Sequence, residues 1–215
     1  VSNRPVAEDI ARVFPATISS SVTSLQIGEV VDFDVPTDSG TSNNVSGTDP
    51  TRKLVWMRGF NSSDTVTDCT DNSKRYGGMA LLNWFTKASG CSDVLYGGAS
   101  ISNTAYVYPG VFADSMSRVM HVAGYAADAT VSDQSLLLTV ADGASGYTLA
   151  ANDTLTFLTA MATVRTSATT AAGLDSLKRA IDKAKNYMKT TLGICASCCS
   201  GTTGNVNMAG IVDLS

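Results

Sequence analysis

Few residues in this sequence are of types that could do chemistry, and they do not form a catalytic pattern. His121 is the only histidine, so any Ser-His-Asp or Cys-His arrangement would have to use it. It lies in the run RVMHVAGY (118–125), which has the composition of the middle of a strand, and the chain holds no Gly-x-Ser-x-Gly elbow. We therefore expect a strand histidine with an ordinary hydrogen-bond partner, no catalytic residue, and a protein that is not an enzyme.

The cysteines are odd in number and suggest neither a metal centre nor a disulfide scaffold. They are Cys69, Cys91, Cys195, Cys198 and Cys199. The last three have the spacing of half a zinc site, but the other cysteines and His121 supply no second close pair. They also follow the C-terminus of a predicted helix, whereas a redox pair gains from a helix N-terminus. We expect no metal and no cofactor, while a bridge between Cys69 and Cys91 remains an open alternative.

Other candidate sites are weak. No Gly-x-Gly-x-x-Gly or P-loop motif is present. Asp32 and Asp34 could bind a cation or act in glycoside hydrolysis, although carboxylates beside a turn are more often surface groups. Asn44, Asn61 and Asn152 begin glycosylation sequons, which would matter only in a secretory compartment.

Composition indicates a globular chain of one domain over residues 1–215. Of its 215 residues 44% are hydrophobic and 16% are charged, which is far from the composition of a disordered chain. A net charge of −4 gives no general electrostatic reason for nucleic-acid binding, so we expect at most weak contact with nucleic acid. The longest apolar runs are too short to span a bilayer, so we expect no membrane span.

Short strand-like segments dominate the chain and predict an all-β, antiparallel β-sandwich. Residues 153–167 are the clearest, because both alternating faces are mostly uncharged, as in a strand covered on both sides. Two polar stretches, 36–50 and 61–78, predict long surface loops. The other expected strands are 22–35, 52–60, 93–97, 104–110, 117–127 and 134–143.

Helical spacing appears in three places. The run EDIARVF (8–14) could hold a short turn, and 79–89 has apolar residues at helical intervals before Gly90. Residues 173–193 predict an amphipathic helix that ends at Gly193, followed by an irregular tail. We expect its apolar stripe to be buried against the sandwich or a neighbouring subunit. The stripe is formed chiefly by Leu177, Ile181, Ala184 and Met188.

The opposite side of the 173–193 helix is basic within an acidic protein. It carries five Lys or Arg residues and two Asp residues, and no aromatic side chain is expected among them. Such a face could contact RNA phosphates or acidic lipid. The more economical interpretation is a packed helix with a solvated Lys-rich side.

Many short Ser/Thr-rich strands, long polar loops and few charges give a pattern that resembles the jelly-roll capsid proteins of small non-enveloped RNA viruses, the picorna-like group. The segment MALLNWFTKASGCSDVLYGG (79–98) looks like the short helix that leads into a sandwich strand in that family. The resemblance implies a jelly-roll coat subunit in a virion. Its partners would be other copies of itself or sister coat proteins, and a host receptor or glycan could bind it.

The alternative is a carbohydrate-binding β-sandwich, such as an extracellular lectin, an adhesin or a phage spike. Such a protein would share the strands and the polar loops. It would use aromatic rings as stacking platforms for sugars. The candidates are Trp56, Trp84, Tyr106 and Tyr108.

Overall fold

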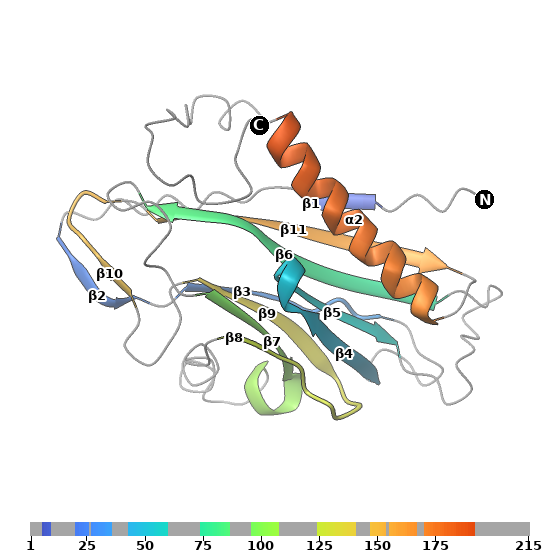
Figure 1. Cartoon of the computed structure of the whole chain (residues 1–215). Coiled ribbons are helices and arrows are strands. Elements are labelled where there is room, and N and C mark those ends of the chain that lie inside the picture. The colour runs from blue at the N-terminus through green and yellow to red at the C-terminus, as the bar shows by residue number, and fades with distance from the viewer. Residues whose placement is uncertain are drawn as a thin grey trace.

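The two larger β-sheets and one long helix are stacked in layers in the computed structural model of the chain (Figure 1). Within the described residues the protein is all-β apart from this helix and two short helical turns. The structure describes residues 6–9, 20–25, 27–35, 43–59, 74–86, 96–107, 124–140, 147–153, 155–166 and 170–191.

The first sheet has five antiparallel strands and forms the middle layer. In spatial order they are β1 (Val6–Asp9), β11 (Leu155–Thr166), β6 (Lys74–Thr86), β5 (Leu54–Gly59) and β4 (Asn44–Asp49). A 3-10 turn, η1 (Pro50–Arg52), joins β4 to β5. The long strands β6 and β11 pair over twelve positions and form the centre of the sheet.

The second sheet has four strands and packs on one face of the first. Its spatial order is β3 (Ile27–Val31), β9 (Gln134–Val140), β7 (Tyr96–Ser102) and β8 (Gly124–Ala126). All its pairings are antiparallel except that of β7 with β8. A π-helical turn, η2 (Asn103–Val107), follows β7. A separate antiparallel pair is formed by β2 (Val22–Leu25) and β10 (Tyr147–Leu149).

The central strands of the middle sheet are buried on both faces. On β11, Leu155 and Phe157 point into the core between the sheets, whereas Leu158 and Ala160 point to the opposite face. The helix α2 (Thr170–Thr190) covers that opposite face (Figure 1). The prediction of a strand covered on both sides at 153–167 is therefore confirmed, and so is the amphipathic helix, with bounds shifted by about three residues.

The predicted helix at 79–89 is wrong, because this segment belongs to strand β6 as far as Thr86. Met79 and Leu81 enter the core between the sheets, while Ala80 and Leu82 enter the core beneath α2. Burial of both faces removes the polar alternation that usually marks a strand. A short apolar run then fits helical spacing equally well.

Four other expectations need correction. The segment 104–110 was expected to be a strand, but residues 103–107 form the turn η2. The expected loop 36–50 contains strand β4, and the expected loop 61–78 contains the first residues of β6. At the N-terminus, Val6–Asp9 is a strand where a helical turn was expected from residue 8. The strands expected at 52–60 and 134–143 are confirmed as β5 and β9.

Candidate interaction surface

The apolar stripe of α2 packs on the middle sheet of its own chain. Leu177 and Ile181 have no exposed surface, and Ala184 and Met188 are buried with them. Small side chains let the helix approach, and at Gly78 a Cβ atom would lie 2.9 Å from Cδ2 of Leu177. Because the stripe faces inwards, a partner can meet α2 only on its other side.

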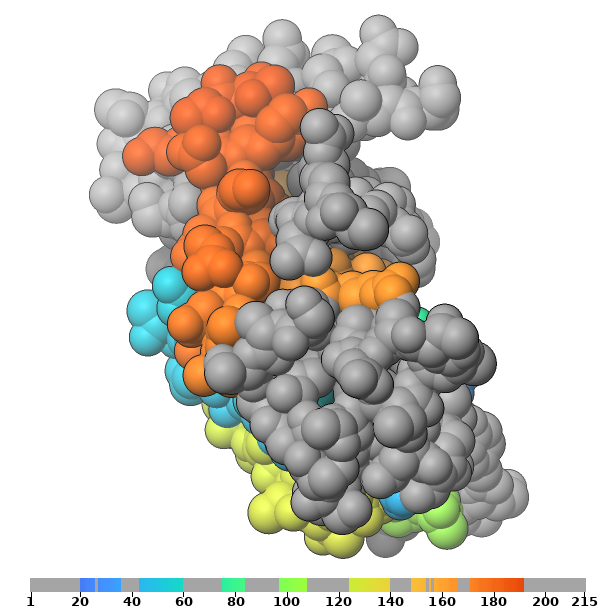
Figure 2. All heavy atoms as spheres, turned by 90° about the vertical axis from the view of Figure 1, so that its right-hand side faces the viewer, coloured from blue at the N-terminus to red at the C-terminus, as the bar shows by residue number. Residues whose placement is uncertain are grey.

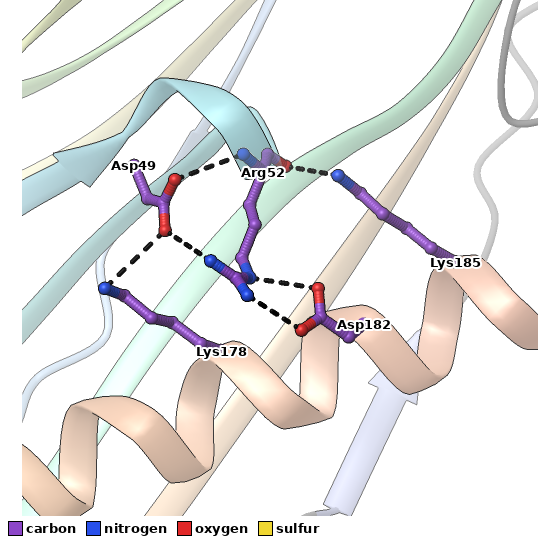
Figure 3. A network of polar contacts seen from close by, with 5 residues as sticks. All are labelled: Asp49, Arg52, Lys178, Asp182 and Lys185. Atoms are coloured by element: carbon purple, nitrogen blue, oxygen red, sulfur yellow. Dashed lines mark hydrogen bonds and ion pairs between the residues drawn. The ribbon is translucent and has the colours of Figure 1, made fainter.

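Arg52 fastens α2 to the turn between β4 and β5 (Figure 3). Its guanidinium donates from Nε to Oδ1 of Asp182 at 2.9 Å and from Nη2 to Oδ2 at 3.0 Å. The remaining nitrogen, Nη1, donates to Oδ2 of Asp49 at 2.9 Å. Both contacts raise the pKa of Arg52, so this side chain stays charged. Because the guanidinium is planar and binds carboxylates on two elements, it fixes the rotation of α2 about its axis as well as its position.

Asp49 is the second anchor of this network. Its Oδ1 accepts from the backbone N–H of Arg52 at 3.2 Å, which caps the turn η1, and Nζ of Lys178 lies 3.6 Å from Oδ2. Burial alone would raise the pKa of Asp49, but the hydrogen bonds and charge of Arg52, with a contribution from Lys178, outweigh burial and lower it. The carboxylate is therefore ionised at neutral pH.

Lys185 closes the network from the next turn of the helix. Its Nζ donates to the backbone carbonyl of Arg52 at 2.7 Å (Figure 3). Burial, assisted by the nearby charge of Lys53, lowers the pKa of Lys185. Two of the five basic residues of the helix, Lys178 and Lys185, are thus engaged with the chain's own turn.

The outer face of α2 consists of the side chains that this docking leaves exposed. Arg179, Lys183 and Lys189 are exposed on it, and so are the acids Asp175 and Asp182, the second of which is ion-paired with Arg52. Tyr187 is also there, with 41% of its surface exposed. The expectation that no aromatic residue lies among these charges is therefore wrong.

Asp32, one of the two acids near the end of β3, is held by hydrogen bonds within the fold. Oδ2 of Asp32 accepts from Nδ2 of Asn103 at 2.8 Å, and Oδ1 accepts from the backbone N–H of Asp34 at 3.3 Å. The same amide donates to Oδ1 of Asp133 at 2.9 Å, and Ser135 donates to its carbonyl oxygen. This network ties β3, η2 and β9 together. Within the described residues, no three His, Cys, Asp or Glu side chains cluster in a way that could hold a metal ion.

Two of the four aromatic residues considered as platforms for sugars, Trp56 and Tyr106, pack against other residues of the chain. The ring of Trp56 covers Gly47 on the neighbouring strand, where a Cβ atom would meet it at 2.4 Å, and its centroid lies 6.5 Å from that of Tyr76. Tyr106 packs on a small cluster on the outer face of the second sheet. Tyr108 and the side chain of Trp84 lie outside the described residues.

Several other sequence candidates also lie outside the described residues, namely His121, Asn61 and the five cysteines. Of the remaining sequons, Asn44 is 1% exposed and cannot accept a glycan in this fold. Asn152 is exposed in a turn with φ 61°.

Comparisons of the chain with protein-family models, with curated proteins and with solved structures gave no match. No helix in the described ranges has the length and apolar character needed to cross a bilayer. What the chain does is therefore inferred from its own residues and geometry.

Proposed function

We propose that the chain is a jelly-roll coat subunit of a virion, which acts through its interfaces with further copies or sister chains and not by catalysis. The observation that carries this proposal is the nesting of its strand pairs. Of the described strands, the first, β1, pairs with the last, β11, while β2 pairs with β10 and β3 with β9, all antiparallel.

Nested pairing is what results when a chain folds as one long antiparallel ribbon and then wraps into two sheets. This wrapping produces the two Greek keys of a jelly roll, an architecture common in capsid proteins. The pairing of β6 with β11 and of β7 with β9 fits the wrapped ribbon. Two features differ from a regular jelly roll: the β4–β5 hairpin extends the first sheet beyond β6, and β8 runs parallel to β7.

The side-chain chemistry also favours a subunit with extensive contacts. Only 16% of the residues are charged, and desolvating a charge at an interface is costly unless that charge is paired. Ser, Thr and Asn side chains can be buried at a contact with a hydrogen bond at a lower cost.

Assembly of the purified chain tests the proposal. We expect particles, or closed rings of fixed stoichiometry, in negative-stain micrographs, together with a large species in sedimentation velocity. A chain that remains monomeric over a wide range of concentration and salt would contradict it. A small oligomer whose melting temperature rises with a glycan would instead support the carbohydrate-binding alternative.

A further inference from the structure

The charge of α2 is opposite in sign to that of the whole chain. The helix carries five basic and two acidic residues, whereas the chain has a net charge of −4. The remainder of the chain is therefore more acidic than the whole. Concentration of positive charge on one exposed helix gives that side of the molecule a local field that attracts polyanions.

Three of these positive charges form no ion pair with another described residue. Within the described residues, Lys183 and Lys189 make no ion pair, and Arg179 donates only to the hydroxyl of Ser176, at 2.7 Å. Arg179 and Lys183 are four residues apart, so they repel each other on the same side of the helix. An anionic partner would relieve this repulsion.

An aromatic ring continues the same row. Arg179, Lys183 and Tyr187 follow one another at four-residue steps, about 6 Å apart along the helix axis. Much of the length of α2 lies at the molecular surface in Figure 2. Proteins usually bind single-stranded nucleic acid with positive side chains along its phosphate backbone and an aromatic side chain on which a base stacks.

We propose that the outer face of α2, formed by Arg179, Lys183, Tyr187 and Lys189, binds single-stranded nucleic acid through its phosphates, with a base stacked on Tyr187. An acidic membrane fits this face less well. Binding of a helix to a membrane surface requires an apolar side that enters the acyl region, and the apolar side of α2 is buried against β6 and β11. Nucleic-acid binding by α2 is a property of the single chain, and it does not depend on whether the chain assembles into particles.

The test is a fluorescence-anisotropy titration of labelled single-stranded oligouridine with the full chain over a range of salt concentrations. Three phosphate contacts predict a slope of about −2 for log K against log salt, since each contributes about −0.7. The affinity should then fall about a hundredfold for a tenfold rise in salt. Replacing Lys183 with Gln should reduce the slope by about 0.7, and the triple change R179Q/K183Q/K189Q should abolish salt-dependent binding.

Two variants separate stacking from charge. Tyr187→Ala should weaken binding at least about fivefold and leave the salt slope unchanged, because stacking releases no counterion. Asp175→Asn should strengthen binding, since it removes an acid from this face and leaves the ion pair of Asp182 with Arg52 intact. Asn186→Ala is the matched control, being exposed on the same face without a charge. Unchanged melting temperatures show that each variant remains folded.

Three results would overturn the proposal. They are absence of binding at low salt, an unchanged slope in the folded triple variant, and binding to phosphatidylserine vesicles without binding to oligouridine. None of these measurements depends on whether the chain forms particles. Failure of assembly and failure of nucleic-acid binding are therefore distinguishable.

Discussion

The contact between Gly78 on β6 and Leu177 on α2 offers a quantitative test of how the helix is docked. A methyl group at Gly78 would lie 2.9 Å from Cδ2 of Leu177 and 3.1 Å from Cδ1 of Leu54. The first distance requires a neighbour to move. Overpacking of this kind costs about 1–3 kcal/mol, which we expect for Gly78→Ala.

Truncation of Leu177 should be costly for the opposite reason. The side chain is fully buried, so Leu177→Ala leaves a cavity and should lower the free energy of unfolding by about 2–5 kcal/mol. In the double variant the new methyl group at Gly78 occupies part of that cavity. We expect the two changes together to cost less than the sum of their separate costs, by about 1–2 kcal/mol, in the range seen for residues in contact.

Urea unfolding followed by far-ultraviolet circular dichroism at neutral pH measures these free energies. The matched control pairs Gly78→Ala with Met188→Ala, because Met188 is buried in the same cluster but lies three turns further along α2. That pair should be additive within about 0.5 kcal/mol. If the Gly78 and Leu177 changes are also additive, the helix does not sit on β6 as described.

Two further changes examine the same docked helix. Ile181→Asp should cost at least about 3 kcal/mol or prevent folding, because it places an unpaired charge in the core, whereas Asn186→Asp on the exposed side should change the melting temperature little. Arg52→Ala should cost no more than about 1–2 kcal/mol, since its ion pair with Asp182 is partly exposed, and urea unfolding measures this. The pKa of Asp49 is lower in the folded chain than the unfolded-state value of 3.8. Its carboxylate therefore stabilises the fold at a pH above 3.8, and this stabilisation is lost as the pH falls below that value. Acid unfolding curves should show a smaller loss of stability below that pH in Arg52→Ala than in the parent.

The sequence was sufficient to predict an element where the local pattern of one segment shows which of its faces are buried. The spacing of three and four residues from Leu177 to Met188 fixes a helix with one buried side, whatever covers it. The uncharged alternation of β11 predicts a strand with two buried faces. In both cases the periodicity alone carries the information.

Where partners far along the chain decide the structure, the sequence was not sufficient. Strand β6 is extended because β5 and β11 pair with its two edges, and its local apolar spacing fits a helix as well. Strand β4 consists mostly of turn-forming residues, and the ring of Trp56 covers its glycine, Gly47, from the next strand. Arg52 and Asp182 are separated by 130 positions, so no local pattern indicates that they meet.

The layered arrangement also restricts where a coat subunit could meet its neighbours. The central strands β5, β6 and β11 of the middle sheet have no free face in the described residues, because the second sheet covers one side and α2 covers the other. The outer face of α2 is charged, so a dry subunit contact there would require each cation to be paired. Within the described part of the chain, the surfaces that remain include the outer face of the second sheet where η2 leaves it uncovered, and the edge strands β1, β4, β3 and β8. If both proposals hold, subunits join along these edges while α2 is directed towards the nucleic acid.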